Sequence, residues 1–509
     1  MKTSVIGFPR IGENRELKFA SEKYFAGKIT AKELEKTAAE LRRNTWLLQK
    51  NAGIDFISSN DFSFYDNMLD TSLMLGVIPK RYRNLCLSKL DTCFAMARGF
   101  QTEKSDVTAL PMKKWFNTNY HYIVPEFDDS VSIQLDDSKA EQEYREASGC
   151  GVQTKPDVIG PYTFLKLSSY AEKKQASDFA DDAAKAYRQL LSNAAKWGAE
   201  WIQIDEPALV LDMTEKDKVL FTKLYKTILE NKKIKVLLQT YFGDVRDFYT
   251  ELVSSGFDGL GLDFVEGKES LSLLDSGTSQ NCTLFAGVIS GKNIWKNNYS
   301  KTSTLVKTIQ EKWKGDVVMS PSCSLLHVPY TVRNEQKLNQ NVLKYFAFAE
   351  EKLTELSDLA TGNSAHFAEN EALFKSERIT ENSEIAARIK NLKKEDFVRL
   401  PVFEEREQIQ KKEFKLPVLP TTTIGSFPQT PDVRANRSGF KKELLRKKNT
   451  LSSIRKKLLN ASRFRKSLVL MFWFMENTNE MIWLNTSVKT LTAIFSHRMP
   501  GFSLTEHAV

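Results

Sequence analysis

Apolar, β-branched runs alternate with amphipathic stretches over residues 1 to about 395. Eight of the apolar runs predict β-strands, and several end in Gly, Pro, Asp or Ser, as strands do where they lead into loops. These runs lie at residues 3–8, 54–59, 157–161, 200–207, 235–244, 259–264, 283–291 and 316–322. Between two of them, residues 178–198 place apolar side chains at helical spacing, and Gly198 is positioned to end the helix.

The number of strand and helix units favours one fold class. About eight units predict an α/β fold of the (β/α)8 TIM-barrel type over residues 1–395, in which the strand ends carry the function. The sequence lacks the GxGxxG pattern of a doubly wound, dinucleotide-binding sheet. We therefore expect a barrel as the N-terminal domain.

A second domain is predicted to begin late in the chain. Residues 396–418 are charged and interrupted by Pro, which predicts an extended interdomain linker. Residues 419–430, LPTTTIGSFPQT, then repeat the N-terminal pattern: Thr3–Arg10 aligns with Thr421–Gln429 when one residue is inserted. The repeat predicts a duplicated barrel, of which residues 419–442 supply the first strand and part of the first helix.

Composition predicts a globular protein whose excess charge lies at one end. The chain has 509 residues, 41% of them hydrophobic, and a net charge of +9. Residues 431–509 contain fifteen Lys and Arg against five Asp and Glu, a bias that is typical of nucleic-acid or acidic-membrane binding. The apolar run Ser467–Phe474 is much shorter than the roughly 20 residues of a membrane helix, and the N-terminus lacks a secretion signal. A cytoplasmic location is expected.

Five cysteines occur in this long chain, and none forms a CxxC pair. Reduced thiols are therefore predicted rather than a disulfide framework. The cysteines are Cys86, Cys93, Cys150, Cys282 and Cys323.

Seven segments, in this order along the chain, resemble the cobalamin-independent methionine synthase family. They are IGFPRIGENRELKFA (6–20), MKKWFNTNYHYIVPEF (112–127), VIGPYTFLKLS (158–168), WIQIDEPALVLD (201–212), LLQTYFGD (237–244), SPSCSLLHVPY (320–330) and LPTTTIGSFPQT (419–430). The resemblance covers residues 1 to about 442.

The resemblance implies two barrels that arose by duplication and act as a monomer. The implied reaction is methyl transfer from 5-methyltetrahydropteroyltri-L-glutamate to L-homocysteine, giving L-methionine without cobalamin. Zinc in the second barrel, held by a His, two Cys and a Glu, would bind the homocysteine sulfur and keep it as a nucleophilic thiolate. These zinc ligands lie beyond the region of resemblance, so no catalytic or metal-binding residue is assigned in this chain.

The resemblance also implies binding residues. Lys and Arg are the expected partners of the anionic glutamate tail of the folate. The implied folate contacts are Arg15, Glu16, Leu17, Lys18 and Lys114, and the implied homocysteine contacts are Ile424, Gly425 and Ser426.

Two further groups of residues have the chemistry of a site. Asp205 and Glu206 resemble an acid/base pair at a barrel strand end, although a structural or substrate-orienting role is favoured because the family's first barrel is not the catalytic one. Cys323 and His327 are four residues apart and could be zinc ligands on a helical turn, but no further Cys or His lies nearby in the sequence.

Residues 443–509 are predicted to be an aberrant basic tail that arose from a shift of reading frame. A family-like segment, Leu-Gly-Leu-Asp-Val-Leu-Val-His-Gly-Glu, read one base out of step, yields Leu468–Glu476. The expectation is an inactive chain without a complete catalytic barrel. Three alternatives stay open: a noncatalytic folate-polyglutamate binder, a basic arm for nucleic acid or membranes, and a misfolded product with exposed apolar surface.

Overall fold

The computed structural model describes residues 1–103, 105–171, 173–376, 382–421, 430–442, 444, 449–457 and 460. The chain divides into two compact units, of which the first comprises residues 1–376 of the described chain and the second begins at Glu377. Residue 395, the predicted end of the first domain, therefore falls in the second unit.

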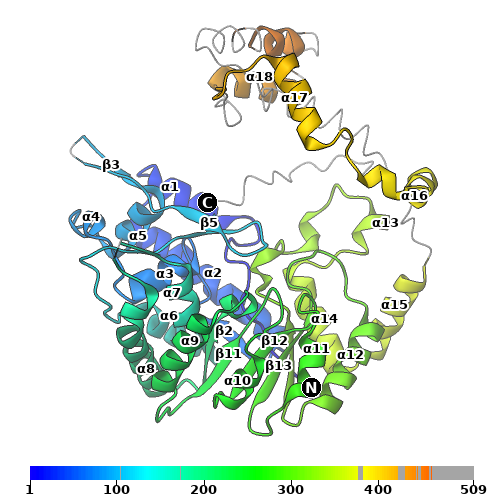
Figure 1. The fold of residues 1–509 in the computed structure, drawn as a ribbon. Coiled ribbons are helices and arrows are strands. Elements are labelled where there is room, and N and C mark those ends of the chain that lie inside the picture. The colour runs from blue at the N-terminus through cyan, green and yellow to red at the C-terminus, as the bar shows by residue number, and fades with distance from the viewer. Residues whose placement is uncertain are drawn as a thin grey trace. The chain divides into compact units, whose positions relative to one another are not determined.

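An eight-stranded parallel sheet forms the centre of the first unit (Figure 1). Its strands are β1 (Lys2–Thr3), β2 (Ile57–Ser59), β8 (Thr154–Ile159), β10 (Trp201–Asp205), β11 (Lys235–Gln239), β12 (Gly259–Asp263), β13 (Thr283–Ile289) and β14 (Val317–Pro321). Neighbours in the sheet are neighbours in this sequence order. The end strands β1 and β2 also meet, because Phe56 N–H donates to Thr3 O over 2.9 Å and Val5 N–H donates to Phe56 O over 3.0 Å. The sheet thus curls round on itself.

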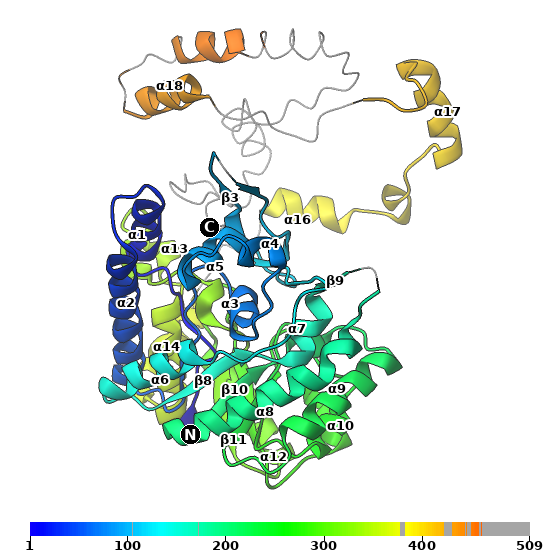
Figure 2. The same ribbon diagram turned by 90° about the vertical axis from the view of Figure 1, so that its left-hand side faces the viewer.

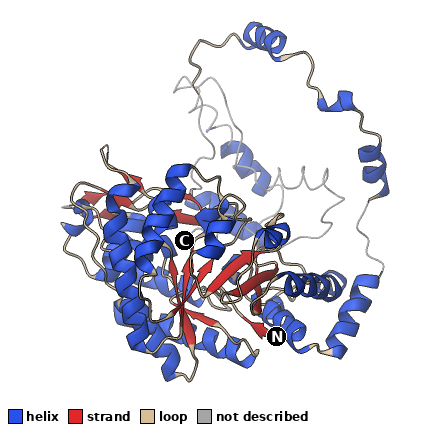
Figure 3. Cartoon of the chain, turned by 60° about the horizontal axis from the view of Figure 1, so that its bottom comes forward, coloured by secondary structure: helices blue, strands red, loops and turns tan. Residues whose placement is uncertain are grey.

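Helices surround the curled sheet (Figure 3). They are α1 (Glu16–Phe25), α2 (Ala31–Asn51), α3 (Asn67–Met74), α4 (Lys80–Arg83), α5 (Lys89–Arg98), α6 (Ser138–Gly149), α7 (Pro161–Leu167), α8 (Ala180–Trp197), α9 (Glu215–Ile228), α10 (Tyr249–Ser254), α11 (Ser270–Leu273), α12 (Tyr299–Lys312), α13 (Gln340–Leu343), α14 (Ala349–Thr361) and α15 (Ser364–Lys375). Figure 2 shows α8 beside α9 on the outside of the sheet. None of the described helices is long and apolar enough to cross a membrane.

Three two-stranded sheets form separately from the eight-stranded sheet in the described residues. They are β3 (Phe100–Gln101) with β4 (Asp106–Val107), β5 (Met112–Lys114) with β6 (His121–Ile123), and β7 (Glu126–Phe127) with β9 (Ser169–Tyr170). The β5–β6 pair lies on the side of the sheet opposite the N-terminus, where the strands end (Figure 1).

The predicted strands and helix are confirmed. Each of the eight predicted apolar runs overlaps one strand of the sheet, and α8 ends at Gly198, whose φ of 92° closes the helix. The strands differ from the predicted runs mainly at their ends: β1 and β11 each end five residues early, and β8 begins at Thr154, three residues before the predicted start at Asp157. Thr154 and Lys155 look like loop residues in the sequence, but both side chains are buried and hydrogen-bonded.

The side chains that β10 directs into the barrel change from apolar to polar along the strand. Alternate residues of a strand face opposite sides, so Trp201, Gln203 and Asp205 point inward while Ile202 and Ile204 join the core between sheet and helices. Trp201 packs with Phe56, Leu237, Phe285 and Val318 at the bottom of the interior. Above this apolar floor the inward side chains become polar, so the strands deliver ionisable groups to their carboxyl ends.

A glycine makes this packing possible. A Cβ added at Gly259 on β12 would lie 2.9 Å from Phe285 and 3.0 Å from Trp201. Any larger residue at this position would therefore displace the aromatic floor.

The second unit corrects one prediction. The described helices include α16 (Ser383–Lys390), α17 (Phe403–Phe414) and α18 (Pro431–Lys441). The extended conformation expected over 396–418 is wrong at Phe403–Phe414, which forms α17, and the linker role of these residues stays a prediction. The sequence of α17, FEEREQIQKKEF, contains good helix formers without Gly or Pro, with Glu in the first turn and Lys in the last. The predicted first strand of a second barrel lies largely outside the described residues. Residues Pro431–Lys441 form α18, and their place in a second barrel stays a prediction.

Candidate functional site

A pocket opens where six strands of the sheet end, and we call it the mouth pocket. It encloses about 640 Å³, including solvent at its opening. Its lining includes Arg10, Asp61, Asp157, Asp205, Tyr241 and His327. The pocket therefore lies where the (β/α)8 type of fold places its functional residues.

Two carboxyl groups on neighbouring strands form the floor of the mouth pocket. Asp205 accepts hydrogen bonds from Gln203 Nε2 over 2.8 Å and from the Tyr241 hydroxyl over 3.0 Å. Burial raises the pKa of Asp205 to about 7. Burial and the adjacent Asp205 carboxyl raise the pKa of Asp157 well above its usual value. A carboxylic acid held partly protonated near neutral pH can both donate and accept a proton.

Lys155 lies beneath these carboxyls and is fully engaged. Its ammonium donates to Val5 O over 2.9 Å, to Ser58 Oγ over 2.7 Å and to Gln203 Oε1. An ammonium has three N–H donors, so these three acceptors use them all. Burial lowers the pKa of Lys155 to about 8. Lys155 thus connects three strands inside the barrel.

Two more aspartates reach the pocket from the segment after β2. Asp61 accepts a hydrogen bond from Phe8 N–H over 3.0 Å, and burial raises its pKa to about 6. Asp66 caps α3 by accepting from Leu69 N–H over 3.0 Å and also accepts from Ile123 N–H over 3.1 Å. Burial raises the pKa of Asp66 to about 7. Asp66 therefore anchors the β6 strand to α3.

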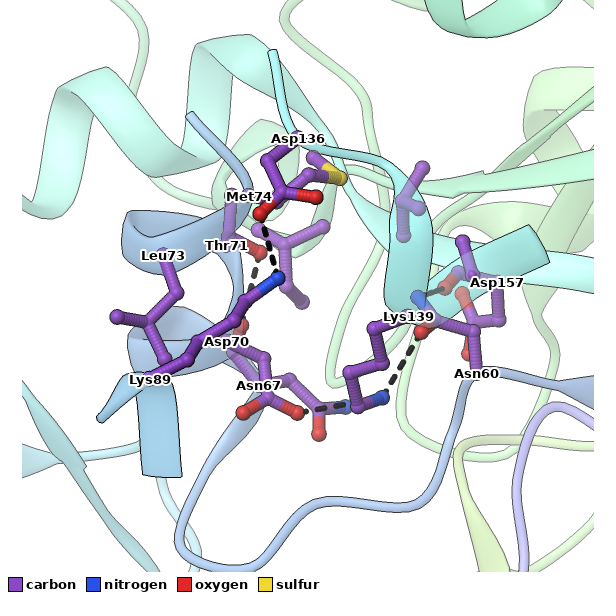
Figure 4. Close-up of a pocket in the computed structure, with 13 residues that line it drawn as sticks. Asn60, Asn67, Asp70, Thr71, Leu73, Met74, Lys89, Asp136, Lys139 and Asp157 are labelled. Atoms are coloured by element: carbon purple, nitrogen blue, oxygen red, sulfur yellow. Dashed lines mark hydrogen bonds and ion pairs between the residues drawn. The ribbon is translucent and has the colours of Figure 1, made fainter. Parts of the chain in front are cut away.

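A second pocket, the side pocket, lies between α3, α6 and β8 (Figure 4). It encloses about 540 Å³ and shares Asn67 and Asp157 with the mouth pocket. Both lysines in its lining form ion pairs. Lys139 pairs with Asp70 at 3.4 Å and donates to Asn60 Oδ1 over 2.8 Å, and Lys89 pairs with Asp136 at 2.6 Å. Asp157 thus stands at the boundary of both pockets.

The two carboxyl groups of the predicted acid/base pair, Asp205 and Glu206, have different surroundings. Glu206 is completely buried outside the barrel, where it accepts from Tyr162 N–H over 3.0 Å, Thr163 N–H over 2.6 Å and the Tyr225 hydroxyl over 2.6 Å. It therefore caps the N-terminus of α7 and ties that helix to α9. Burial raises its pKa to about 7. Only Asp205 of the pair reaches the mouth pocket, which supports the structural role favoured for Glu206.

The side chains of Cys323 and His327 have separate contacts. The Cys323 thiol is completely buried and contacts Ser324 O, and burial raises its pKa. His327 packs edge-on against Tyr120 and against Phe242, and burial lowers its pKa to about 3. Within the described ranges, no group of three or more His, Cys, Asp or Glu could hold a metal ion.

The implied folate residues occupy two elements at the strand-end side of the sheet. Arg15 precedes α1 with a left-handed φ of 63°, and Glu16 accepts from Asn14 N–H over 3.0 Å. Lys18 is half-buried on α1, and Lys114 is exposed at the end of β5. Figure 1 shows α1 and β5 on the side where the strands end.

Leu17 differs from the other implied contacts. Its side chain is 4% exposed and packs with Ala38 and Phe62, and its N–H donates to Ile11 O over 3.1 Å. Its observed contacts hold α1 in place, and its role in folate binding stays a prediction. Ile424, Gly425 and Ser426 lie outside the described residues.

Sequence reasoning missed most of the mouth pocket. Arg10, Asp61, Asp157 and Tyr241 line it but were not singled out as site residues. For Arg10, Asp61 and Tyr241 the signal that could have found them is their position after or near the end of predicted strands, which in a barrel meet at one face. Asp157 carried no such signal, because it opens the predicted run 157–161 and only the structure moves the start of β8 back to Thr154.

Comparisons with known proteins identify two family domains in the chain. Residues 2–314 match a family model described as the N-terminal domain of cobalamin-independent synthase, and residues 419–470 match that of its catalytic domain. The second match runs to residue 470, so the expected end of the resemblance at about residue 442 is wrong. The out-of-frame origin of residues 443–509 stays a prediction.

Curated relatives extend over most of the chain. The 5-methyltetrahydropteroyltriglutamate–homocysteine methyltransferase of Lactococcus lactis subsp. cremoris is 50% identical over 476 residues, covering 92% of this chain and 63% of the relative. That of Streptococcus thermophilus is 51% identical over 450 residues, covering 87% of this chain and 60% of the relative. The chain thus spans less than two thirds of the length of these relatives.

The chain also has a weak likeness to a solved structure. A B12-independent methionine synthase from Shewanella sp. W3-18-1, in complex with selenomethionine, gives a TM-score of 0.46 at 15% identity, over 67% of this chain and 92% of that one. Because the N-terminal domain model alone matches more than half of the residues, the chain belongs to the cobalamin-independent methionine synthase family.

Proposed function

We propose that residues 1–376 form the donor-binding half of a homocysteine methyltransferase. The donor is 5-methyltetrahydropteroyltri-L-glutamate, the acceptor is L-homocysteine, and the product is L-methionine. The observation that carries the proposal is the continuous match of residues 2–314 to the family's N-terminal domain. The names of the curated relatives give the reaction class and both substrates.

The basic residues at the strand-end side fit a polyanionic donor. Arg15, Lys18 and Lys114 bring positive charge to α1 and β5, and a guanidinium can bind a carboxylate through two parallel hydrogen bonds. Glu16 holds the turn before α1 through Asn14 N–H. In this proposal Arg15, Lys18 and Lys114 bind the glutamate tail, and Ile424, Gly425 and Ser426 contact the acceptor.

Zinc belongs to the family reaction implied by the resemblance, but the described residues do not fit it. Within that part of the chain, Cys and His side chains are not gathered with carboxylates into a metal-binding group. Cys323 and His327 are held in separate contacts. We therefore derive no step through zinc, and the residues described here bind and orient the donor.

For the 509-residue polypeptide alone we propose donor binding without turnover. The support is that only residues 419–470 match the catalytic-domain model. A monomeric state, a cytoplasmic location and the out-of-frame origin of residues 443–509 stay predictions. The basic-arm alternative predicts salt-dependent binding of RNA or anionic vesicles.

Calorimetric titration of the full chain tests the proposal. We expect 5-methyltetrahydropteroyltriglutamate to bind more tightly than the monoglutamate, because the tail supplies most of the ionic contacts, and we expect the difference to shrink as salt is raised. Equal binding of the two donors, or no binding of either, contradicts the proposal. Methionine formation is assayed in parallel with the Lactococcus lactis relative as the positive control. Turnover by the 509-residue chain would contradict the second part of the proposal.

A further inference from the structure

Three polar side chains from distant segments meet at the turn of the β5–β6 hairpin, and we call them the latch. Lys292 Nζ donates to Asn117 Oδ1 over 2.8 Å and pairs with Glu266 Oε1 at 2.7 Å. Asn117 Nδ2 in turn donates to Glu266 Oε2 over 3.1 Å. Each member therefore contacts both of the others, and the latch joins the hairpin turn to the loops that follow β12 and β13.

The two charged members of the latch come from loops that are fixed to the barrel. Asp263, the last residue of β12, accepts a hydrogen bond from Glu266 N–H over 2.8 Å. Lys292 lies shortly after the end of β13, and a Cβ added at its neighbour Gly291 would lie 2.5 Å from Cys323 O. The carboxylate and the ammonium are thus presented by closely packed backbone.

The hairpin has little support of its own. All three side chains of β5 are exposed. The turn is closed where Trp115 N–H donates to Tyr120 O over 2.8 Å. Because an isolated two-stranded hairpin is at best marginally stable, contacts with the rest of the barrel must hold this turn in place.

An aromatic contact beside the latch has an unusual backbone. Phe116 and Phe242 pack with ring centroids 5.5 Å apart, and their φ angles of 50° and 75° both lie in the left-handed region. Bulky residues keep this conformation only where the surrounding contacts impose it. Lys292 Nζ lies 5.4 Å from the centroid of the Phe242 ring, so the ammonium of the latch also contacts the aromatic pair.

The position of the turn sets the position of Lys114. This residue directly precedes Trp115 and lies opposite His121 in the hairpin. A binding group on an ordered backbone loses less conformational entropy when its ligand arrives, and its affinity is correspondingly higher. An ordered turn would therefore favour any contact that Lys114 makes.

We propose that the latch holds the hairpin turn, and with it Lys114, in the position that binds the glutamate tail of the donor. Asn117, Glu266 and Lys292 are positioning residues and do not touch the donor. This inference rests on the proposed function, because it takes Lys114 as a contact of the triglutamate. Without the latch, the donor has to order the turn as it binds.

Three substitutions separate positioning from charge. Asn117→Ala leaves the net charge unchanged, Glu266→Ala removes a negative charge and Lys292→Met removes a positive one. In calorimetric titrations of the full chain, we expect each to weaken binding of the triglutamate donor about three- to tenfold. Charge alone predicts unchanged, tighter and weaker binding, respectively. Glu266→Ala that binds the donor as tightly as the unaltered chain, or more tightly, overturns the proposal.

The same substitutions in a Lys114→Ala background test the route of the effect. We expect Glu266→Ala and Lys292→Met to cause no further loss of donor binding there, because the contact that they position is already gone. Equal losses in both backgrounds overturn the proposal. A further loss for Lys292→Met alone would show that Lys292 binds the donor itself, which also overturns it.

Lys235→Met is the matched control. Lys235 has the same two kinds of contact as Lys292, an ion pair with Glu200 at 2.9 Å and an aromatic ring, that of Trp201, at 5.3 Å. It lies at the start of β11, at the opposite end of the barrel strands from the hairpin. Lys235→Met should bind the donor like the unaltered chain, and an equal loss in this variant would contradict a specific role for the latch.

Hydrogen exchange measures the latch without the donor. We expect the backbone amides of residues 113–121 to exchange about three- to tenfold faster in each latch variant and at an unchanged rate in Lys235→Met. Unchanged exchange in the latch variants overturns the proposal even when the donor binds. If the unaltered chain binds no donor, the proposed function fails and the positioning of Lys114 for it fails too, whereas faster exchange still assigns the order of the turn to the latch.

Discussion

Asp205 and Glu206 are adjacent in the sequence, yet their carboxyl groups lie on opposite sides of the barrel wall. Asp205 points inward and accepts from the Tyr241 hydroxyl over 3.0 Å, whereas Glu206 points outward and accepts from the Tyr225 hydroxyl over 2.6 Å. Alternation along β10 explains the divergence. The two groups therefore have separate roles, which substitutions can distinguish.

Glu206→Gln is expected to destabilise the barrel. Both oxygens of Glu206 accept hydrogen bonds, and an amide has only one acceptor oxygen, so its NH2 group must face a backbone N–H or the Tyr225 hydroxyl. We expect a loss of about 1–3 kcal/mol in the free energy of unfolding, measured by urea unfolding. Tyr225→Phe removes a single donor and should cost less. Unchanged stability of Glu206→Gln would refute the capping role.

The free energy of unfolding is expected to depend on pH because Asp205 is protonated more readily in the folded state. Burial raises its pKa from 3.8 to about 7, so the folded state binds the proton more tightly than the unfolded state. The stabilisation is fully present below pH 3.8 and is lost as the pH rises through about 7. Relative to Asp205→Asn, the unaltered chain should lose up to about 1.4 kcal/mol per pH unit in this window.

Unfolding of both proteins at a series of pH values from 5 to 8 measures this difference. Asp129→Asn removes an exposed carboxyl and serves as the control. A stability difference between Asp205→Asn and the unaltered chain that stays constant with pH would contradict the assignment of a buried, protonated Asp205.

Lys113 and Lys114 provide a matched pair for testing the glutamate tail. They are neighbours on β5, both are exposed, and their side chains face opposite sides of the β5–β6 pair. We expect Lys114→Ala to weaken binding of the triglutamate donor about three- to tenfold, as for the loss of one partly screened ion pair. Lys113→Ala should have a smaller effect. Equal effects of the two substitutions would argue against a specific contact at Lys114.

Cysteine reactivity should follow burial. Cys86 is exposed, whereas Cys93, Cys282 and Cys323 are buried. Burial raises the pKa of Cys282 to about 12 and also raises that of Cys93. Because the thiolate is the reactive form, Cys86 should react first with a thiol reagent in the native state. The fast phase should disappear in Cys86→Ser. A fast phase that persists in Cys86→Ser and also in the double variant with the half-buried Cys150→Ser would show that one of the buried thiols is accessible.

The sequence by itself determined the repeating elements of this protein. Strand and helix periodicity predicted all eight strands and α8, because an element that buries one face carries apolar residues at regular intervals along the sequence. The family motifs also identified α1 and β5 as candidate binding elements. The prediction of an extended conformation was wrong at residues 403–414. Pro and charged residues outside α17 outweighed the good helix formers within it in that prediction.

Only the tertiary structure decided which polar residues share a site. Asp61, Asp157 and Asp205 are far apart in sequence and meet because parallel strands end at one face of the barrel. Their raised pKa values and the engagement of Lys155 by three strands likewise depend on burial and on partners from distant segments. Periodicity indicates which side of a strand is buried, but it does not indicate which side chains from distant strands meet on that side.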